Sequence, residues 1–399
     1  MADVPGSPGN AAQPGRSVRA LVAGCLVGGA AGWSLTAAGA GTTALEAAYG
    51  VDLVVIGLFT TAMAVPYALL QLSGGSLVDR WGARATALLG LVLVVVAYLG
   101  ALVAPVPALA LTARIVVGVG SAVCFAAGAD FARTSRTGPT GLGIFGGVAI
   151  ATGGAAVLGV PLAEGLLGWR SAWATSMAMS LVALVAVALV PAATSAAARP
   201  PVPGQGHASV LRDAELHRLA SIHAVTLGLG VVLSNWVAVV LERVWGLGSG
   251  LSALLGSMVL GLAIASRPLG GYLGRRRPED TRIMVVGALV ASAAATATLA
   301  VPSSVPVAAL AVFVLGVAPG LPFAAVLAAA QARRADRPAA AVGVMNLQAN
   351  TLVMLGAPLL GAAIQRQLST AGLLVVAVLW LVPLLALPRS LGRRLRATG

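Results

Sequence analysis

Long apolar stretches separated by short polar breaks run along almost the whole chain. Each stretch holds about 18 to 25 residues, the length that an α-helix needs to cross the roughly 30 Å hydrocarbon core of a bilayer. We therefore expect an all-α membrane protein. The pattern predicts twelve transmembrane helices, at residues 18–41, 52–74, 86–104, 107–129, 141–164, 171–193, 219–241, 251–273, 283–301, 306–329, 343–366 and 371–388.

The longest internal polar break begins with a cluster of Pro and Gly and divides the twelve helices into two sets of six. Proline and glycine punctuate regular structure, so this break predicts a domain boundary. The expected organisation is a cytoplasmic N-terminal tail, a first half, a cytoplasmic central linker, a second half and a cytoplasmic C-terminal tail, at residues 1–17, 18–194, 195–218, 219–388 and 389–399.

Two short matches between the halves indicate an internal repeat. The segment GVGSAVCFAA from Gly118 is similar to GVAPGLPFAA from Gly316, and GGSL from Gly74 is similar to GGYL from Gly270. Both pairs have nearly the same offset. Transporter spans that pack around a central pathway commonly show such repeats, so we expect two pseudo-symmetric six-helix halves.

The charged residues fix the expected orientation. Only 9% of the residues are charged, against roughly 25% in soluble domains, and all the basic residues are arginine. With the N-terminus inside, the outer loops hold only Arg170, Arg243 and Arg366. Because Arg-rich short loops stay on the cytoplasmic side, both termini are expected in the cytoplasm and the protein in the cell membrane. Topology thus explains the net charge of +13 without a nucleic-acid partner.

The polar break after the second predicted helix reads GGSLVDRWGAR, from Gly74 to Arg84. It resembles the inner-loop motif G-x-L-x-D-R-x-G-x-R of the major facilitator superfamily in spacing, membrane side and ordinal position. The resemblance implies that family's twelve-helix fold. It also implies gating roles for Gly75, Asp79, Arg80, Gly82 and Arg84, and Asp130, at the inner end of the fourth helix, is the expected partner of Arg80 or Arg84.

An arginine also lies within the fourth predicted helix. Arg114 is followed by Gly118 and Gly120, which is similar to the R-x-x-x-G-x-G pattern of the same family. A charge near the bilayer centre costs at least about 2.5 to 3.5 kcal/mol unless it faces a cavity or a partner. We therefore expect Arg114 to point inward, where it either binds substrate or donates to backbone carbonyls of neighbouring helices.

The second intramembrane arginine lies in ASRPLGGYLGRRR, where Arg267 is about two turns deeper than the arginine cluster that ends the segment. It either binds substrate or reaches back to the inner surface. The R-P-x-G-G pattern loosely resembles the nitrate/nitrite and cyanate-type branch. That branch carries an arginine shortly before a Pro-Tyr pair, where this chain reads MAVPY up to Tyr67, which places nitrate itself in doubt.

No carboxylate is predicted near the midplane, so the two intramembrane arginines favour an anionic solute that would supply the missing charge. The three histidines, His207, His217 and His223, lie in or beside the central loop, so a solvated loop position is expected for them and not a role as proton carriers within the membrane. Polar and aromatic residues inside the predicted helices either line a cavity or make interhelical hydrogen bonds. These candidates are Trp33, Tyr67, Gln71, Asn235, Asn346 and Asn350.

The chain has no metal-binding His pair, phosphate loop or nucleophile set, so no enzyme, catalytic residue, metal or cofactor is expected. We expect a monomeric secondary active transporter that moves a small solute across the cytoplasmic membrane by alternating access. The favoured substrate is a small anion, taken up or exchanged, with the lipid bilayer and a coupling proton as further partners. The alternatives are an efflux pump for drugs or metabolites and a non-transporting sensor with the same fold.

Overall fold

The computed structural model describes residues 14–135, 139–191, 208–335, 338–388 and 391, and this part of the chain contains helices and no strands. Eleven segments within it are long and apolar enough to cross a membrane. One of these, residues 143–188, holds the fifth and sixth predicted spans joined by a short turn. The predicted twelve-helix arrangement is therefore confirmed. The predicted tails and most of the predicted linker lie outside the described residues.

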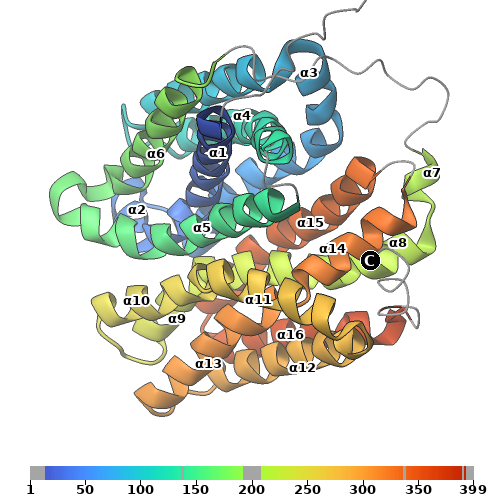
Figure 1. Cartoon of the computed structure of the whole chain (residues 1–399). Helices are drawn as coiled ribbons and strands as arrows, with labels where there is room; N and C mark the ends of the chain where they lie inside the picture. Colours follow the sequence, from blue (N-terminus) through green and yellow to red (C-terminus); the bar gives the residue numbers. More distant parts are fainter. Residues whose placement is uncertain (1–13, 136–138, 192–207, 336–337, 389–390, 392–399) are drawn as a thin grey trace, which may run out of the picture.

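The first half forms one bundle, coloured blue to green in Figure 1. Its elements are α1 (Pro14–Ala40), the short α2 (Thr42–Tyr49), α3 (Leu53–Ala101), α4 (Pro107–Thr134), α5 (Pro139–Leu167), the 3₁₀ turn η1 (Gly168–Arg170) and α6 (Ser171–Ala188).

The second half lies beside the first and is coloured yellow to red. Its elements are α7 (Ala208–Leu211), α8 (Ala214–His223), the π-helical η3 (Ala224–Leu229), α9 (Gly230–Arg243), α10 (Ser249–Gly261), α11 (Ala263–Arg276), η4 (Pro278–Asp280), α12 (Thr281–Leu299), α13 (Val305–Val317), the 3₁₀ turn η5 (Ala318–Gly320), α14 (Phe323–Arg333), α15 (Pro338–Gln365), α16 (Ser369–Leu381) and η6 (Val382–Ala386).

The second and third spans form a single helix, α3, with a kink at Gly82. The backbone of Gly82 has φ 78° and ψ 156°, a region that is essentially restricted to glycine because a side chain would clash there. The glycine of the inner-loop motif therefore sets the turn between these two spans.

The internal repeat is visible in two equivalent helix crossings. A β-carbon on Gly118 would lie 2.3 Å from the carbonyl oxygen of Met63, and one on Gly316 would lie 2.3 Å from that of Met258. The fourth span thus touches the second through glycine in the same way as the tenth span touches the eighth. Small residues let membrane helices approach this closely. The crossings confirm the predicted pseudo-symmetric halves.

Three spans of the second half are interrupted, whereas α1, α4 and α5 of the first half are continuous. The seventh span contains the π-helical η3, the eighth is divided at Leu262, and the tenth contains η5, where Pro319 and Pro322 break the α-helix. The segments η3 and η5 contact each other. Interrupted transmembrane helices commonly form the binding sites of transporters.

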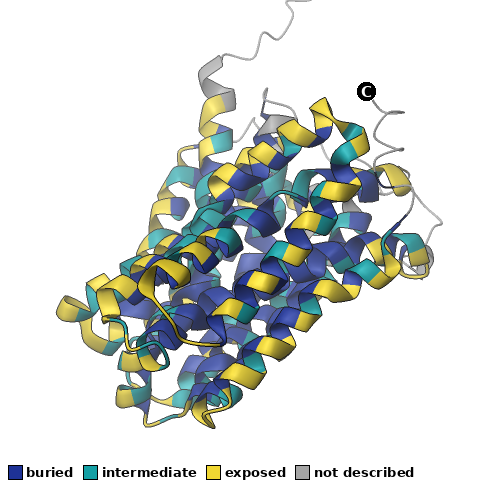
Figure 2. Ribbon diagram, turned by 90° about the horizontal axis from the view of Figure 1, so that it is seen from below, coloured by how far each residue is buried: buried dark blue, intermediate teal, exposed yellow. Residues whose placement is uncertain are grey.

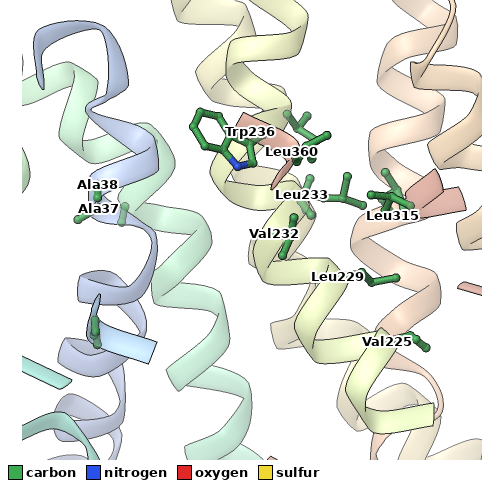
Figure 3. Close-up of a cluster of buried hydrophobic side chains, with 14 of the residues drawn as sticks. Ala37, Ala38, Val225, Leu229, Val232, Leu233, Trp236, Leu315 and Leu360 are labelled. Carbon is green, nitrogen blue, oxygen red and sulfur yellow. The ribbon is translucent and has the colours of Figure 1, made fainter. Parts of the chain in front are cut away.

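Buried apolar side chains fill both halves and the surface between them. Figure 3 shows Val225, Leu229, Val232, Leu233 and Trp236 along η3 and α9 within this core. Large apolar side chains such as Leu162, Leu166 and Leu385 are instead exposed on the outside of the bundle, and Figure 2 shows exposed positions running along the outer helix faces. Such an apolar exterior fits a lipid environment.

We call the end of the bundle that carries the Gly82 turn, Asp213 and Arg333 the linker end. At the opposite end the two halves are closely joined, because Arg243 of α9 forms an ion pair with Glu46 of α2. Further inward, a β-carbon on Gly57 of α3 would lie 2.6 Å from the Cα atom of Pro358 on α15.

Candidate functional site

Arg267 of α11 points into the interface between the two halves. Its side chain is buried, and Nη1 donates a hydrogen bond of 3.1 Å to the carbonyl oxygen of Gly146 on α5, in the other half. The guanidinium carbon lies 3.9 Å from the ring centre of Phe323 on α14, which is a cation–π contact. Nε is buried without a hydrogen-bond partner. The guanidinium thus lies between the halves and does not reach back to the surface.

The interruption of the tenth span explains how Phe323 comes to lie over Arg267. A β-carbon on Gly270 would lie 2.0 Å from the carbonyl oxygen of Leu321, and one on Gly320 would lie 1.9 Å from Oγ of Ser266. The backbones of α11 and of the η5 region are therefore in direct contact at both glycines. This contact places the first turn of α14 against the side chain of Arg267.

A chain of hydrogen bonds crosses the same interface. Nε2 of His223, at the end of α8, lies 3.1 Å from Oδ1 of Asn346 on α15, and Nδ2 of Asn346 donates to Oε1 of Gln71 on α3 at 3.3 Å. Asn350 supports this arrangement by donating through Nδ2 to the backbone oxygen of Asn346, at 2.8 Å. Gln71, His223, Arg267, Phe323 and Asn346 together form what we call the interface cluster.

Gln71 and Arg267 occupy equivalent positions in the two halves. They are 196 residues apart, as are Gly74 and Gly270 of the repeat. Each also contacts the opposite half, and each has a buried donor atom without a hydrogen-bond partner within 3.5 Å, namely Nε2 of Gln71 and Nε of Arg267. The side chain of Gln71 also interacts with that of Tyr67, one turn earlier on α3. Buried polar groups are rarely left unpaired in the absence of a ligand or water.

Aromatic rings extend along the first-half side of this region. Tyr67, one turn before Gln71, packs edge to face on Phe125 with ring centres 6.1 Å apart. Phe125 in turn lies 4.9 Å from Phe145, which directly precedes Gly146 in the chain. On the other side, the ring of His223 lies 5.9 Å from that of Phe323. Phe323 therefore contacts both Arg267 and His223, whereas the ring of Phe145 packs into the first half against Gly28 and Gly128.

Arg114 has entirely different surroundings. It is fully buried, and it donates to the carbonyl oxygens of Phe59 and Ser34 at 2.8 and 2.6 Å and to the hydroxyl of Tyr98 at 3.3 Å. Its guanidinium carbon lies 5.9 Å from the ring centre of Trp173. These partners all belong to the first half, and two of them are backbone carbonyls. This geometry matches the structural alternative considered for Arg114.

Two further candidate residues make interhelical hydrogen bonds away from the interface cluster. Nε1 of Trp33 donates to Oγ1 of Thr175 at 3.1 Å, within the first half. Asn235 accepts a hydrogen bond of 3.2 Å from the hydroxyl of Thr60, which joins the seventh span to the second, and donates to the backbone of its own helix. Their assignment to the substrate site stays a prediction.

The structure corrects the expected partner of Asp130. Asp130 forms an ion pair with Arg133, three residues later on the same face of α4, and not with Arg80 or Arg84. Nη2 of Arg84 instead donates to the carbonyl oxygen of Ala188 at the end of α6, at 3.0 Å. The side chain of Arg80 is exposed. For Gly75 and Asp79 the structure describes only the helical backbone, and the gating role of the motif stays a prediction.

His223 is the residue that the sequence-based assignment placed wrongly. It is 3% exposed and lies inside the bundle, not in a solvated loop. Its position within the predicted span 219–241 was a usable signal, because a residue four positions into a span is covered by neighbouring helices.

Among the described residues, no group of three or more His, Cys, Asp or Glu side chains could hold a metal ion.

The fold and the polar cluster between its halves define a multi-pass transporter architecture. The chain belongs to the Major Facilitator Superfamily, because the model of that family matches residues 22–358. No curated protein matches the sequence.

Solved structures with the same fold include two transporters. The human organic anion transporter MFSD10 (TETRAN) has 16% sequence identity and a TM-score of 0.68, with 96% of this chain and 100% of that chain covered. The nucleoside transporter NupG has 12% identity and a TM-score of 0.70, with 93% and 98% covered. Both similarities show the fold, and membership of the Major Facilitator Superfamily indicates a membrane transporter.

Proposed function

We propose that this protein is a secondary active transporter that moves a small organic anion across the cytoplasmic membrane by alternating access, with Arg267 as the anion-binding residue. The observation that carries the proposal is the pair of unpartnered buried donors, Nε of Arg267 and Nε2 of Gln71, at equivalent positions of the two halves. An anion bound between the halves would accept hydrogen bonds from both.

The charge of Arg267 supports an anionic ligand. A buried guanidinium is costly when no opposite charge accompanies it. In the described part of the chain no carboxylate forms an ion pair with Arg267, and its one hydrogen-bond acceptor is the neutral carbonyl of Gly146. A carboxylate or another oxyanion would provide the missing charge and fits the planar donors of arginine.

The neighbouring rings favour an organic anion over a bare inorganic one. Phe323 already covers one face of the Arg267 guanidinium, and Tyr67, Phe125 and Phe145 pack in series on the first-half side. A ligand with a flat apolar body and an anionic group would bury that body against such rings. The likeness to a human organic anion transporter is consistent with this class.

The distribution of contacts between the halves supports alternating access. At the opposite end the halves are held by the Arg243 and Glu46 ion pair and by the backbone approach at Gly57. Nearer the linker end, the polar contacts between them are those of Gln71 and Arg267. If the halves rock about the level of Gln71 and Arg267, the interface cluster is exposed first to one side of the membrane and then to the other. In this proposal the linker end faces the cytoplasm, with both termini.

A thermal-shift screen of the purified protein tests the proposal. The ligands are p-aminohippurate, oxalate, nitrate, thymidine and the lipophilic cation tetraphenylphosphonium. A ligand that binds the folded state raises its melting temperature. We expect stabilisation by p-aminohippurate, its loss in Arg267→Gln, and its retention in Arg218→Gln, a matched substitution of an exposed arginine at the linker end.

Other outcomes would overturn the proposal. Stabilisation by tetraphenylphosphonium without any response to anions would favour an efflux pump for cationic drugs. Stabilisation by an anion, with no exchange of that anion across proteoliposome membranes, would favour a sensor with a transporter fold.

A further inference from the structure

We propose that His223 takes up the proton that is coupled to anion transport. This inference rests on the proposed function, because it assigns the coupling step to a residue of the same site. It is carried by the position of His223 inside the bundle and by its hydrogen bond to Asn346, which in turn donates to Gln71 across the interface between the halves.

The hydrogen bonds fix which nitrogen of His223 can accept a proton. Because Nδ2 of Asn346 donates to Gln71, Oδ1 of Asn346 is the acceptor for N–H of His223 Nε2. The hydrogen of the neutral ring is then on Nε2, and Nδ1 keeps a lone pair. Protonation at Nδ1 leaves the bond to Asn346 intact and adds one positive charge to the interface cluster.

The groups that face His223 make its protonation sensitive to an anion. Among the described residues, Arg267 of α11 is the charged group that acts on it electrostatically. From the neighbouring helix α14, Phe323 faces His223. The charged residue of α14, Arg333, lies at the other end of that helix and is paired with Asp213 and Glu215. The helix α15 carries only neutral amides among its polar side chains that face α8, and η3 and η6 have no ionisable side chain. On α8 itself, His217 is the other titratable residue that contacts α15, through Gln348.

In apolar surroundings, the positive charge of Arg267 disfavours a second positive charge on His223 unless an anion lies beside them. An anion at Arg267 therefore favours a proton on His223, and a proton on His223 favours the anion. This mutual dependence is the thermodynamic requirement for moving the two together, since each ligand raises the affinity for the other. The proton and a monovalent anion would bind with no net change in charge.

A charge on His223 would act directly on an irregular segment of the backbone, the π-helical η3. His223 is the last residue of α8, and the six residues that follow form the π-helical η3. A β-carbon on Gly228 of η3 would lie 2.6 Å from the carbonyl oxygen of Ala349 on α15, so η3 packs directly on the helix that carries Asn346. Short π-helical segments are rare and frequently mark functional sites.

Binding of p-aminohippurate at pH 6 and pH 8, followed by thermal shift, tests the inference. For wild type we expect the apparent affinity to be about tenfold higher at pH 6, within the limit of roughly 100-fold that one linked proton allows over two pH units. His223→Gln, which keeps a hydrogen bond to Asn346, is expected to bind with little dependence on pH. His217→Gln, a matched change on the same helix near the linker end, is expected to behave like wild type.

Failure of this inference is distinct from failure of the proposed function. Binding that keeps its full pH dependence in His223→Gln would overturn the role of His223 alone. Absence of binding at both pH values in wild type would overturn the proposed function and this inference with it.

A second measurement covers the case in which His223→Gln does not fold. The chain has three histidines, so the ¹⁵N spectrum of histidine-labelled protein contains three imidazole pairs. Addition of p-aminohippurate at constant pH is expected to convert one pair from the neutral to the protonated form. Unchanged spectra under saturating p-aminohippurate would contradict the proposal.

Discussion

Arg114 and Arg267 are both buried arginines within transmembrane helices, and each has one buried nitrogen without a hydrogen-bond partner, Nη2 of Arg114 and Nε of Arg267. Their surroundings differ in two respects. Arg114 has partners from its own half, two of them backbone carbonyls, on continuous helices. Arg267 contacts the opposite half and lies beside an interrupted span. Depth in the membrane alone does not identify a ligand-binding charge. The partners of the charge, and the half to which they belong, are more informative.

We propose different roles for the two arginines. Arg114 joins α4 to α1 and α3, and in this proposal it stabilises the first half as a rigid unit. Arg267 lies at a surface that must separate if the halves rock, and its one hydrogen bond, to Gly146 of the other half, would then be exchanged for one to substrate. Substitution of each arginine should therefore change a different measured quantity.

The largest expected effect is the loss of stability in Arg114→Gln. The carbonyl oxygens of Ser34 and Phe59 would lose a charged donor in a buried position. Each unsatisfied buried group costs about 1 to 3 kcal/mol, so the free energy of unfolding should fall by roughly 2 to 6 kcal/mol. Denaturation of the detergent-solubilised variant measures this. A variant as stable as wild type, but without anion binding, would reverse the roles of the two arginines.

The second effect is the loss of anion affinity in Arg267→Gln. Removal of a charged hydrogen-bond donor from the ligand costs about 1.5 to 3 kcal/mol, which corresponds to a decrease of roughly 10- to 150-fold in affinity. Stability should fall less than in Arg114→Gln, because Arg267 donates to one acceptor and Arg114 donates to three. Parallel measurements of anion affinity and melting temperature check this. A large fall in melting temperature would show that Arg267 is structural, as Arg114 is.

A smaller effect is expected at the equivalent position of the first half. Gln71→Leu removes a neutral hydrogen-bond donor and replaces it with an apolar side chain of similar size. The affinity for p-aminohippurate should fall by roughly 2- to 13-fold, which corresponds to a loss of about 0.5 to 1.5 kcal/mol. Titration of p-aminohippurate against the purified variant measures this. An affinity equal to that of wild type would mean that the unpartnered Nε2 of Gln71 does not face the ligand.

The smallest effect concerns Asp213, which caps α8 and accepts a 2.9 Å hydrogen bond from Arg333. Partial burial acts to raise the pKa of Asp213, but the hydrogen bond from Arg333 and those from the backbone N–H groups of Leu216 and Glu215 outweigh it and lower the pKa. A lowered pKa of a carboxyl group stabilises the fold above the unfolded value of about 4 and loses this contribution as the pH falls through the folded value.

Asp213→Asn should therefore reduce stability at pH 7 by about 1 kcal/mol, as expected for an ion pair whose arginine is partly exposed, and the difference from wild type should shrink in acid. Melting curves at pH 7 and pH 3.5 measure this. The matched control is Asp280→Asn, because Asp280 is half-exposed and lies 3.9 Å from Arg277. A difference for Asp213→Asn that grows in acid would contradict the sign derived from its pKa.

Much of the fold followed from the apolar pattern, because helix length, loop arginines and the repeat at Gly118 and Gly316 are properties of the chain itself. The rotation of each helix about its axis was not predictable in this way. That rotation decides that Arg114 faces its own half. The pairing of Asp130 with Arg133 does not depend on it, because residues three apart on one helix are neighbours, so the sequence spacing could have predicted this pair. The equivalence of Gln71 and Arg267 was available from the repeat offset, whereas their unpartnered donors depend on atomic positions.

The most direct test of the account is counterflow of labelled p-aminohippurate into proteoliposomes preloaded with the unlabelled compound. Wild type and Arg218→Gln are expected to exchange the anion at similar rates, and Arg267→Gln at least about tenfold more slowly, because a charged donor to the ligand is lost. Exchange by Arg267→Gln at the wild-type rate, or no exchange by wild type, would contradict the claim that this protein carries an organic anion bound at Arg267.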